Sequence, residues 1–201
     1  MSNNLHQNQK IILDYEHRLA SILAKKVVEK PTLTVWRIIM PLLLIYHAIK
    51  LKEYRKEIEI FTRGVLKSKI LALGSAINEI RLNSPDQGYV HSLSDAADSS
   101  TPNRKLFISR QKAEVELLKS HYKKILKSSG RDYAELVKNV YGKPGAYREY
   151  LLKLDKAEQD VRDSVLKLHH PGDSAREMSR KMMQAVRSIR KDQVREIFSQ
   201  D

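Results

Sequence analysis

The fold depends above all on residues 41–82, which read PLLLIYHAIKLKEYRKEIEIFTRGVLKSKILALGSAINEIRL. Apolar residues recur there at spacings of mostly three and four, which is the period of an amphipathic helix. Pro41 suits the first turn of a helix, and Asn83-Ser84-Pro85 stops the pattern. If the helix is continuous, it is about 60 Å long at 1.5 Å per residue. Gly64 and Gly74 are the positions where it could bend.

The same period recurs through most of the chain, and no stretch alternates like a strand. An apolar stripe runs along residues 12–23, and another along residues 147–168. Capping signals open three further helices: Thr101-Pro102, Asp132 with Glu135, and Ser174 with Glu177. The sequence therefore predicts an all-α protein of about six helices, with an N-terminal hairpin of long helices and a C-terminal helical bundle.

Residues 83–103 interrupt the helical pattern with Ser, Asp, Gly and Pro, and their only charges are acidic. A structureless connection of about twenty residues is unusual inside a compact domain. We therefore expect an acidic flexible linker there. It separates an N-terminal helical lobe, residues 1–82, which contains the apolar segment 36–51, from a C-terminal helical bundle, residues 104–201.

The charge balance indicates an anionic partner. The 201 residues carry a formal net charge of +13, and the pI is near 9.8. Such a field attracts nucleic acid, anionic lipid or acidic proteins without choosing among them. Cysteine is absent, which fits a reducing compartment. Residues 1–9 lack the basic-then-apolar pattern of a secretory signal, so we expect a cytoplasmic protein, peripheral at a membrane.

The twelve residues 38–49 carry no charge. They are short for a bilayer core, which needs about 20 helical residues, and basic residues flank both sides. Two interpretations remain open. The segment is a buried core helix, or two short pieces meeting at Pro41 enter one leaflet, with both basic ends at the anionic surface. In the second case the membrane contacts are Trp36, Arg37, Ile38, Ile39, Leu42, Leu43, Leu44, Ile45 and Tyr46.

Basic residues also gather on two later helices. In the last helix, one face is expected to bind anions because the arginine fork suits phosphate and carboxylate. Its members are Arg176, Arg180, Arg187, Arg190 and Lys191. In the helix over residues 104–127, four lysines border the apolar stripe, which is typical of an interfacial helix or of a solvated bundle helix. They are Lys105, Lys112, Lys119 and Lys123.

The remaining polar and aromatic residues suggest no chemistry. Asp155, Glu158, Asp160 and Asp163 alternate with basic residues on one helix and are interpreted as surface ion pairs. Nine tyrosines against three phenylalanines favour half-buried helix positions over a thick core. We find no acid–base or nucleophile constellation and no metal-ligand spacing, so we expect neither an enzyme nor a cofactor, and no small-molecule substrate is evident. No motif identifies a family.

The leading hypothesis is a non-catalytic helical interaction or scaffold protein. It is held at an anionic membrane surface through residues 36–51 and adjacent basic residues, or binds an acidic protein. The alternative is a soluble basic helical protein that binds nucleic acid through the Arg-rich face of the last helix. A third possibility is a soluble helical adaptor whose apolar segment is core.

Overall fold

The computed structural model describes residues 2–28, 30, 41–85, 101–169 and 172–199, and of residues 41–50 only the helical backbone. These residues form six helices and no strand, which confirms the all-α prediction. The helices are α1 (Ser2–Val27), α3 (Pro41–Leu82), α5 (Pro102–Leu126), α6 (Tyr133–Tyr141), α7 (Pro144–His169) and α8 (Asp173–Phe198). Helix α3 is a single element of 42 residues, uninterrupted at Gly64 and Gly74.

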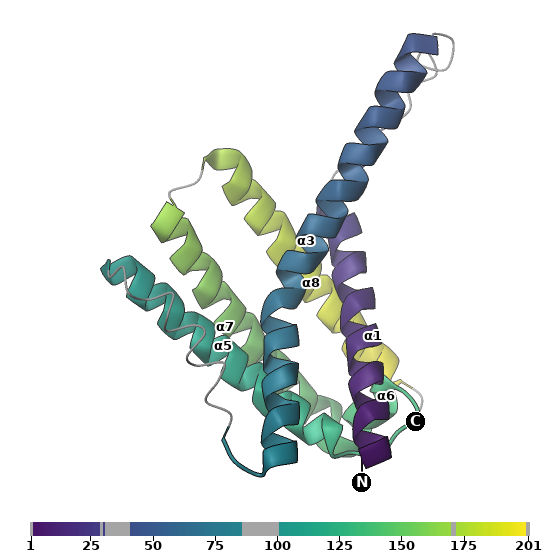
Figure 1. Cartoon of the computed structure of the whole chain (residues 1–201), viewed down its shortest axis with the longest axis vertical. Coiled ribbons are helices and arrows are strands. Elements are labelled where there is room, and N and C mark those ends of the chain that lie inside the picture. Colours follow the sequence, from purple (N-terminus) through teal and green to yellow (C-terminus); the bar gives the residue numbers. More distant parts are fainter. Residues whose placement is uncertain (1, 29, 31–40, 86–100, 170–171, 200–201) are drawn as a thin grey trace.

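The six helices share one hydrophobic core. Helix α3 packs against α1 and α5, α5 packs against α7, and α8 contacts both α1 and α7 (Figure 1). Buried core residues come from every helix, for example Ile12 of α1, Leu73 of α3 and Val194 of α8. The N-terminal and C-terminal parts of the chain, on either side of the expected linker, are therefore joined through common packing.

The helix ends follow local signals in most cases. The Asp132 side chain accepts a hydrogen bond from the Glu135 amide at 2.9 Å, which opens α6, and Gly142 closes it at a φ of 66°. A positive φ suits glycine because it has no Cβ. The predicted start of α8 is wrong by two residues. The helix begins at Asp173 with Gly172 as its N-cap, so Ser174 lies within the first turn.

Tyrosine and histidine form part of the core. Of the seven tyrosines whose side chains are described, four are half-buried, as expected, and three are buried, namely Tyr122, Tyr133 and Tyr147. Tyr122 and Tyr147 are 0% and 1% exposed. His121 lies among the tyrosines, with its Nδ1 atom 2.7 Å from the Tyr141 hydroxyl and its ring 4.1 Å from the Tyr150 ring. Burial lowers the pKa of His121 to about 3, so the imidazole is neutral. A tyrosine ring can be buried because its apolar face packs against neighbours while its hydroxyl group finds a hydrogen-bond partner.

The two halves of α3 have different surroundings. From Leu66 onward the helix contributes buried residues at spacings of three and four, including Ala72 and Ala76, which are both 0% exposed. Before Leu66 no described side chain of α3 is classed as buried: Phe61 and Val65 are half-buried, and the first turns of the helix project beyond the other helices (Figure 1). We call residues 41–65 the α3 arm. Among the described residues, no helix is both long and apolar enough to cross a membrane.

Candidate functional site

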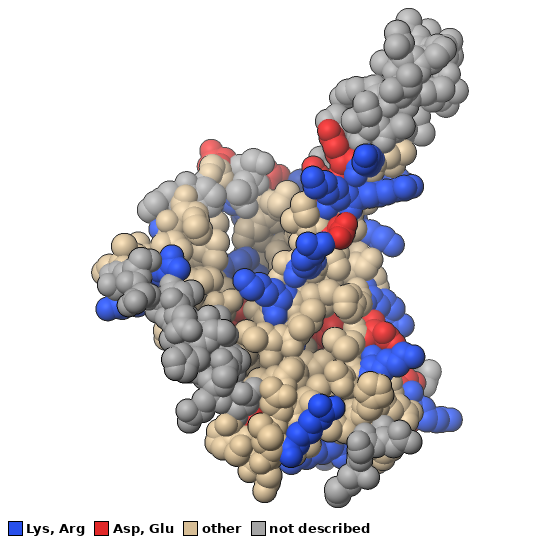
Figure 2. Space-filling view, viewed as in Figure 1, with Lys and Arg blue, Asp and Glu red and all other residues tan. Residues whose placement is uncertain are grey.

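The α3 arm places basic and apolar residues away from the core. Lys52, Arg55 and Lys56 are exposed, and Figure 2 shows basic side chains gathered along this part of α3. Apolar groups lie among them, because Ile60 is 58% exposed. The described side chains of the arm are exposed or half-buried, so basic and apolar groups along it are available to another surface.

Five of the nine predicted membrane-contact residues lie at the far end of this arm. Residues 36–39 are outside the described part of the chain. Leu42, Leu43, Leu44, Ile45 and Tyr46 lie in the first turns of α3, and their side chains are likewise not described. The backbone therefore places residues 42–46 at the projecting end of the helix (Figure 1).

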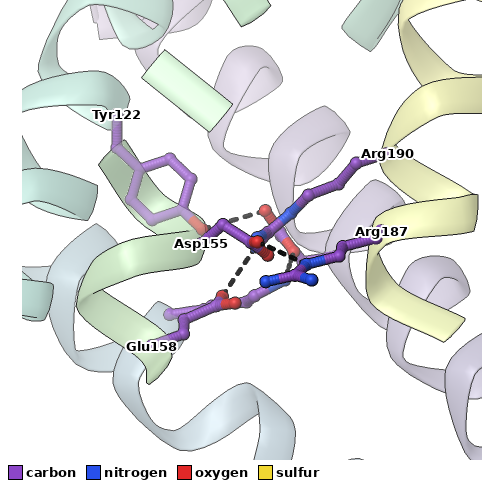
Figure 3. Close-up of polar contacts among 7 residues, drawn as sticks. Tyr122, Asp155, Glu158, Arg187 and Arg190 are labelled. Atoms are coloured by element: carbon purple, nitrogen blue, oxygen red, sulfur yellow. Dashed lines mark hydrogen bonds and ion pairs between the residues drawn. The ribbon is translucent and has the colours of Figure 1, made fainter. Parts of the chain in front are cut away.

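Two of the five predicted anion-binding residues bind carboxylates of the protein itself. Arg190 donates from Nη1 to Asp155 at 2.9 Å and from Nη2 to Glu158 at 2.7 Å (Figure 3). Arg187 donates to the other Asp155 oxygen at 3.0 Å. These bonds join α8 to α7, so Asp155 and Glu158 form interhelical contacts in addition to lying on a charged helix face. Arg176, Arg180 and Lys191 are exposed on α8.

The Arg190 side chain is only 11% exposed. Burial alone would lower its pKa, but Glu158 and Asp155 outweigh burial and raise the pKa above its ordinary value. A guanidinium held by two carboxylates at this depth has few donors left for a phosphate. The pairing explains why the cationic face expected from helical periodicity is smaller in the folded protein.

The α5 lysines also serve the packing of helices. Lys119 and Lys123 bind the buried Glu79 of α3 at 2.8 and 2.6 Å. Burial would lower the pKa of Lys119, but Glu116 and Glu79 raise it. Lys105 is exposed and Lys112 is half-buried. Two of the four lysines therefore link α5 to α3, as expected for lysines that border a bundle core.

A second ionic contact is buried where α1, α3 and α5 meet. Lys69 binds Glu16, and the Tyr122 hydroxyl donates to the other Glu16 oxygen at 2.9 Å. Glu16 and Lys69 are 7% and 9% exposed. Removing either ion would leave the other buried without its counter-charge, so loss of one partner should be strongly destabilising.

A groove of about 520 Å³ opens between α3 and the α7–α8 pair, with α1 and α5 behind it. Figure 2 shows this face hollowed beside α3. We call it the α7–α8 groove. Its walls are apolar: Phe61, Val65, Val161, Val165, Leu166, Met178, Met182, Val186 and Ile189 are among them. Charged groups line one end, namely Lys69, Glu114, Glu158, Arg162 and Arg190.

Two of these charged groups have unusual environments. Glu114 is 8% exposed, and burial, reinforced by Glu158, raises its pKa to about 7, while a hydrogen bond from Ser68 opposes that rise. Burial lowers the pKa of Arg162 despite three carboxylates in its vicinity. Within the described part of the chain, the Arg162 guanidinium has neither a hydrogen bond nor an ion pair.

The sequence analysis did not identify the groove. The sequence does contain one indication of it, which is the spacing of charged residues relative to apolar ones. Glu114 precedes the buried Leu118 by four residues, and Arg162 precedes Val165 by three, so each pair shares a helix face. Charges in phase with an apolar stripe indicate groups that face other helices. Which of them meet a partner depends on the distance between helices, and a single sequence does not contain that distance.

The described residues contain no cluster of three or more His, Cys, Asp or Glu side chains placed to hold a metal ion. No protein-family model matches the chain, and comparisons with curated proteins and with solved structures found no match. The function must therefore be argued from the arm, the exposed basic residues and the groove.

Proposed function

We propose that the protein is a non-catalytic helical interaction protein that attaches to an anionic membrane surface through the α3 arm. The observation that carries the proposal is the projection of residues 41–65 from the bundle (Figure 1). An apolar sequence lies at the outer end of this arm, and Lys52, Arg55 and Lys56 follow directly behind it. That order brings apolar groups to the lipid and cations to the headgroups.

Both energy terms favour this orientation. Each Lys or Arg close to an anionic surface contributes about 1 kcal/mol, and buried apolar area adds to it. Burial of the apolar run in the chain's own core is the competing interpretation. In α3, every described residue of the core cluster lies in the C-terminal half, from Leu71 onward. None of the arm residues whose side chains are described, 51–65, belongs to the core cluster, so this part of the arm favours a contact outside the bundle.

The nucleic-acid alternative has less support. It relied on five basic residues of α8, and two of them, Arg187 and Arg190, bind Asp155 and Glu158. Phosphate contacts by these two would compete with existing ion pairs. We therefore do not propose it.

Co-sedimentation with vesicles tests the proposal. Wild-type protein should pellet with vesicles containing phosphatidylserine and stay in the supernatant with phosphatidylcholine alone. Leu43→Asp with Leu44→Asp should reduce the bound fraction at least tenfold while circular dichroism stays unchanged. Lys52→Gln with Arg55→Gln and Lys56→Gln should weaken binding and remove much of its salt dependence.

A matched control removes three exposed charges from α7: Arg148→Gln, Lys153→Gln and Lys167→Gln. This variant has the same net charge as the basic-arm variant, and it should bind nearly as well as wild type. Equal loss in both variants would show that net charge, and not the arm, attracts the protein. Unfolding of the Leu43 and Leu44 variant would show that the apolar run is core, and the proposal would fail.

A further inference from the structure

We propose that the α7–α8 groove binds a single-chain anionic amphiphile, with the alkyl chain between the apolar walls and the head group on Arg162. The inference does not depend on membrane attachment, although Phe61 and Val65 at the inner end of the α3 arm line the groove. It rests on the size and lining of the groove and on the one cation there without a partner in the described part of the chain.

The size of the groove favours a small ligand. Small-molecule sites span about 300–1,000 Å³ and combine apolar walls with a few polar groups. The α7–α8 groove has about 520 Å³ and this kind of lining. A groove of this size and lining can hold an alkyl chain along its length.

The shape of the groove favours a chain-like ligand. Its α8 wall runs from Met178 to Arg190, which corresponds to about 18 Å of helix at 1.5 Å per residue. Met178 is 46% exposed and Val165 is 36% exposed, so the apolar surface continues to the outside. Methionine side chains are flexible and adapt to irregular apolar ligands. One end of the groove is therefore apolar and open, and the other is charged.

The charged end favours an anion over a cation. Lys69 is neutralised by Glu16, and Arg190 by Asp155 and Glu158. Arg162 has no such bond, and its half-burial means that water solvates it incompletely. An oxyacid head group that accepts two hydrogen bonds from the guanidinium would compensate this charge. Glu114 offers limited opposition because its raised pKa leaves it partly protonated near neutrality.

Calorimetric titration with defined amphiphiles below their micelle concentrations tests the proposal. Tetradecanoate and tetradecyl phosphate distinguish a carboxylate from a phosphate head group. At least one should bind saturably at one site per chain. Tetradecyltrimethylammonium and hexanoate should bind at least about tenfold more weakly, because one lacks the anion and the other most of the chain. Equal binding of the cationic amphiphile would overturn the role of Arg162.

Substitutions then locate the site. Arg162→Gln should weaken binding about tenfold or more, which is the usual effect of losing a charged hydrogen bond. Arg148→Gln on the same helix should change nothing. Met182→Trp should fill the groove and abolish binding, and Val165→Trp at its opening provides a second blocking variant if the first one unfolds. Unchanged binding in the blocking variants would reject the groove as the site.

Methyl NMR on labelled methionine gives a readout independent of affinity. The ligand should shift the Met178 and Met182 signals, which come from the groove, and leave that of Met183 nearly unchanged. Absence of binding by both anionic amphiphiles would overturn the proposal. Self-association of the chain that Met182→Trp abolishes, without amphiphile binding, would instead assign the groove to a second copy.

Discussion

The two halves of α3 share the same spacing of apolar residues, but their surroundings differ. Both carry apolar residues at helical spacing, such as Ile58 and Phe61 before the middle of the helix and Leu73 and Ile77 after it. The C-terminal half is packed between α1 and α5, whereas the N-terminal half forms the projecting arm (Figure 1). Periodicity thus identifies a helix with an apolar face, but it does not show which molecule covers that face.

The ion pairs that α3 residues make repeat the contrast and give the largest expected effect. Lys69→Met should reduce the free energy of unfolding by about 3–5 kcal/mol, because Glu16 is then buried without its cation. Arg63→Ala breaks the exposed pair with Glu59 and should cost less than about 0.5 kcal/mol. Urea denaturation measures both. Adding Glu16→Gln to Lys69→Met should restore much of the stability, and equal costs for the two single variants would contradict the contrast.

Shortening an apolar side chain should likewise cost more stability in the C-terminal half of α3 than in the arm. Leu73→Ala removes a side chain that is 3% exposed and should cost about 2–5 kcal/mol through lost contacts and a residual cavity. Ile60→Ala, at 58% exposure, should stay within about 0.5 kcal/mol of wild type. Thermal unfolding followed by circular dichroism compares them. A large loss for Ile60→Ala would mean that the arm is part of the cooperative fold.

The pH dependence of stability tests the junction between the halves, where Ser68 hydrogen-bonds Glu114. The folded pKa of Glu114 is raised from 4.5 to about 7. Its protonated form therefore stabilises the fold fully below pH 4.5, and this contribution is lost as the pH rises through 7. By pH 8, Glu114→Gln should gain on the order of 3 kcal/mol over wild type relative to pH 4. A constant difference between these pH values would show that Glu114 titrates normally.

The smallest effect concerns two glycines in otherwise equivalent helical positions. A Cβ at Gly64 or at Gly74 would have no atom within 4 Å. Gly74→Ala should raise global stability by up to about 1 kcal/mol, because alanine is the better helix former. Gly64→Ala should raise it less, since the arm can fray without unfolding the bundle. Amide exchange should instead slow locally around residue 64. Equal global gains would show that the arm unfolds together with the core.

Local signals predicted most of the fold. Pro41 and Asn83 bound α3 where expected, and Asp132 caps α6 as its sequence indicates. These features depend on a few neighbouring residues, so a single sequence contains them. Gly172 replaces Ser174 as the α8 cap because the helix begins earlier than the capping-box pattern indicates.

Pairings between distant residues were not predictable in this way. Arg190 binds Asp155, which is 35 positions away in the sequence, and Tyr122 binds Glu16, which is 106 positions away. Helical periodicity placed each charge on a face but gave no information on the helix opposite. The tyrosine core escaped prediction for the same reason, since each ring is buried only when α5, α6 and α7 come together.

Asn8 has a consequence for how the chain folds during synthesis. Its side-chain amide donates to the carbonyl groups of Leu126 and Ser128, at 3.1 and 2.8 Å, where α5 ends. Helix α1 also contacts α8. Helix α1 is synthesised before α5 and α8, so it reaches these partners only after they have emerged. Until then only α3 is present to cover its apolar stripe, so refolding should be slower than the helix content alone suggests.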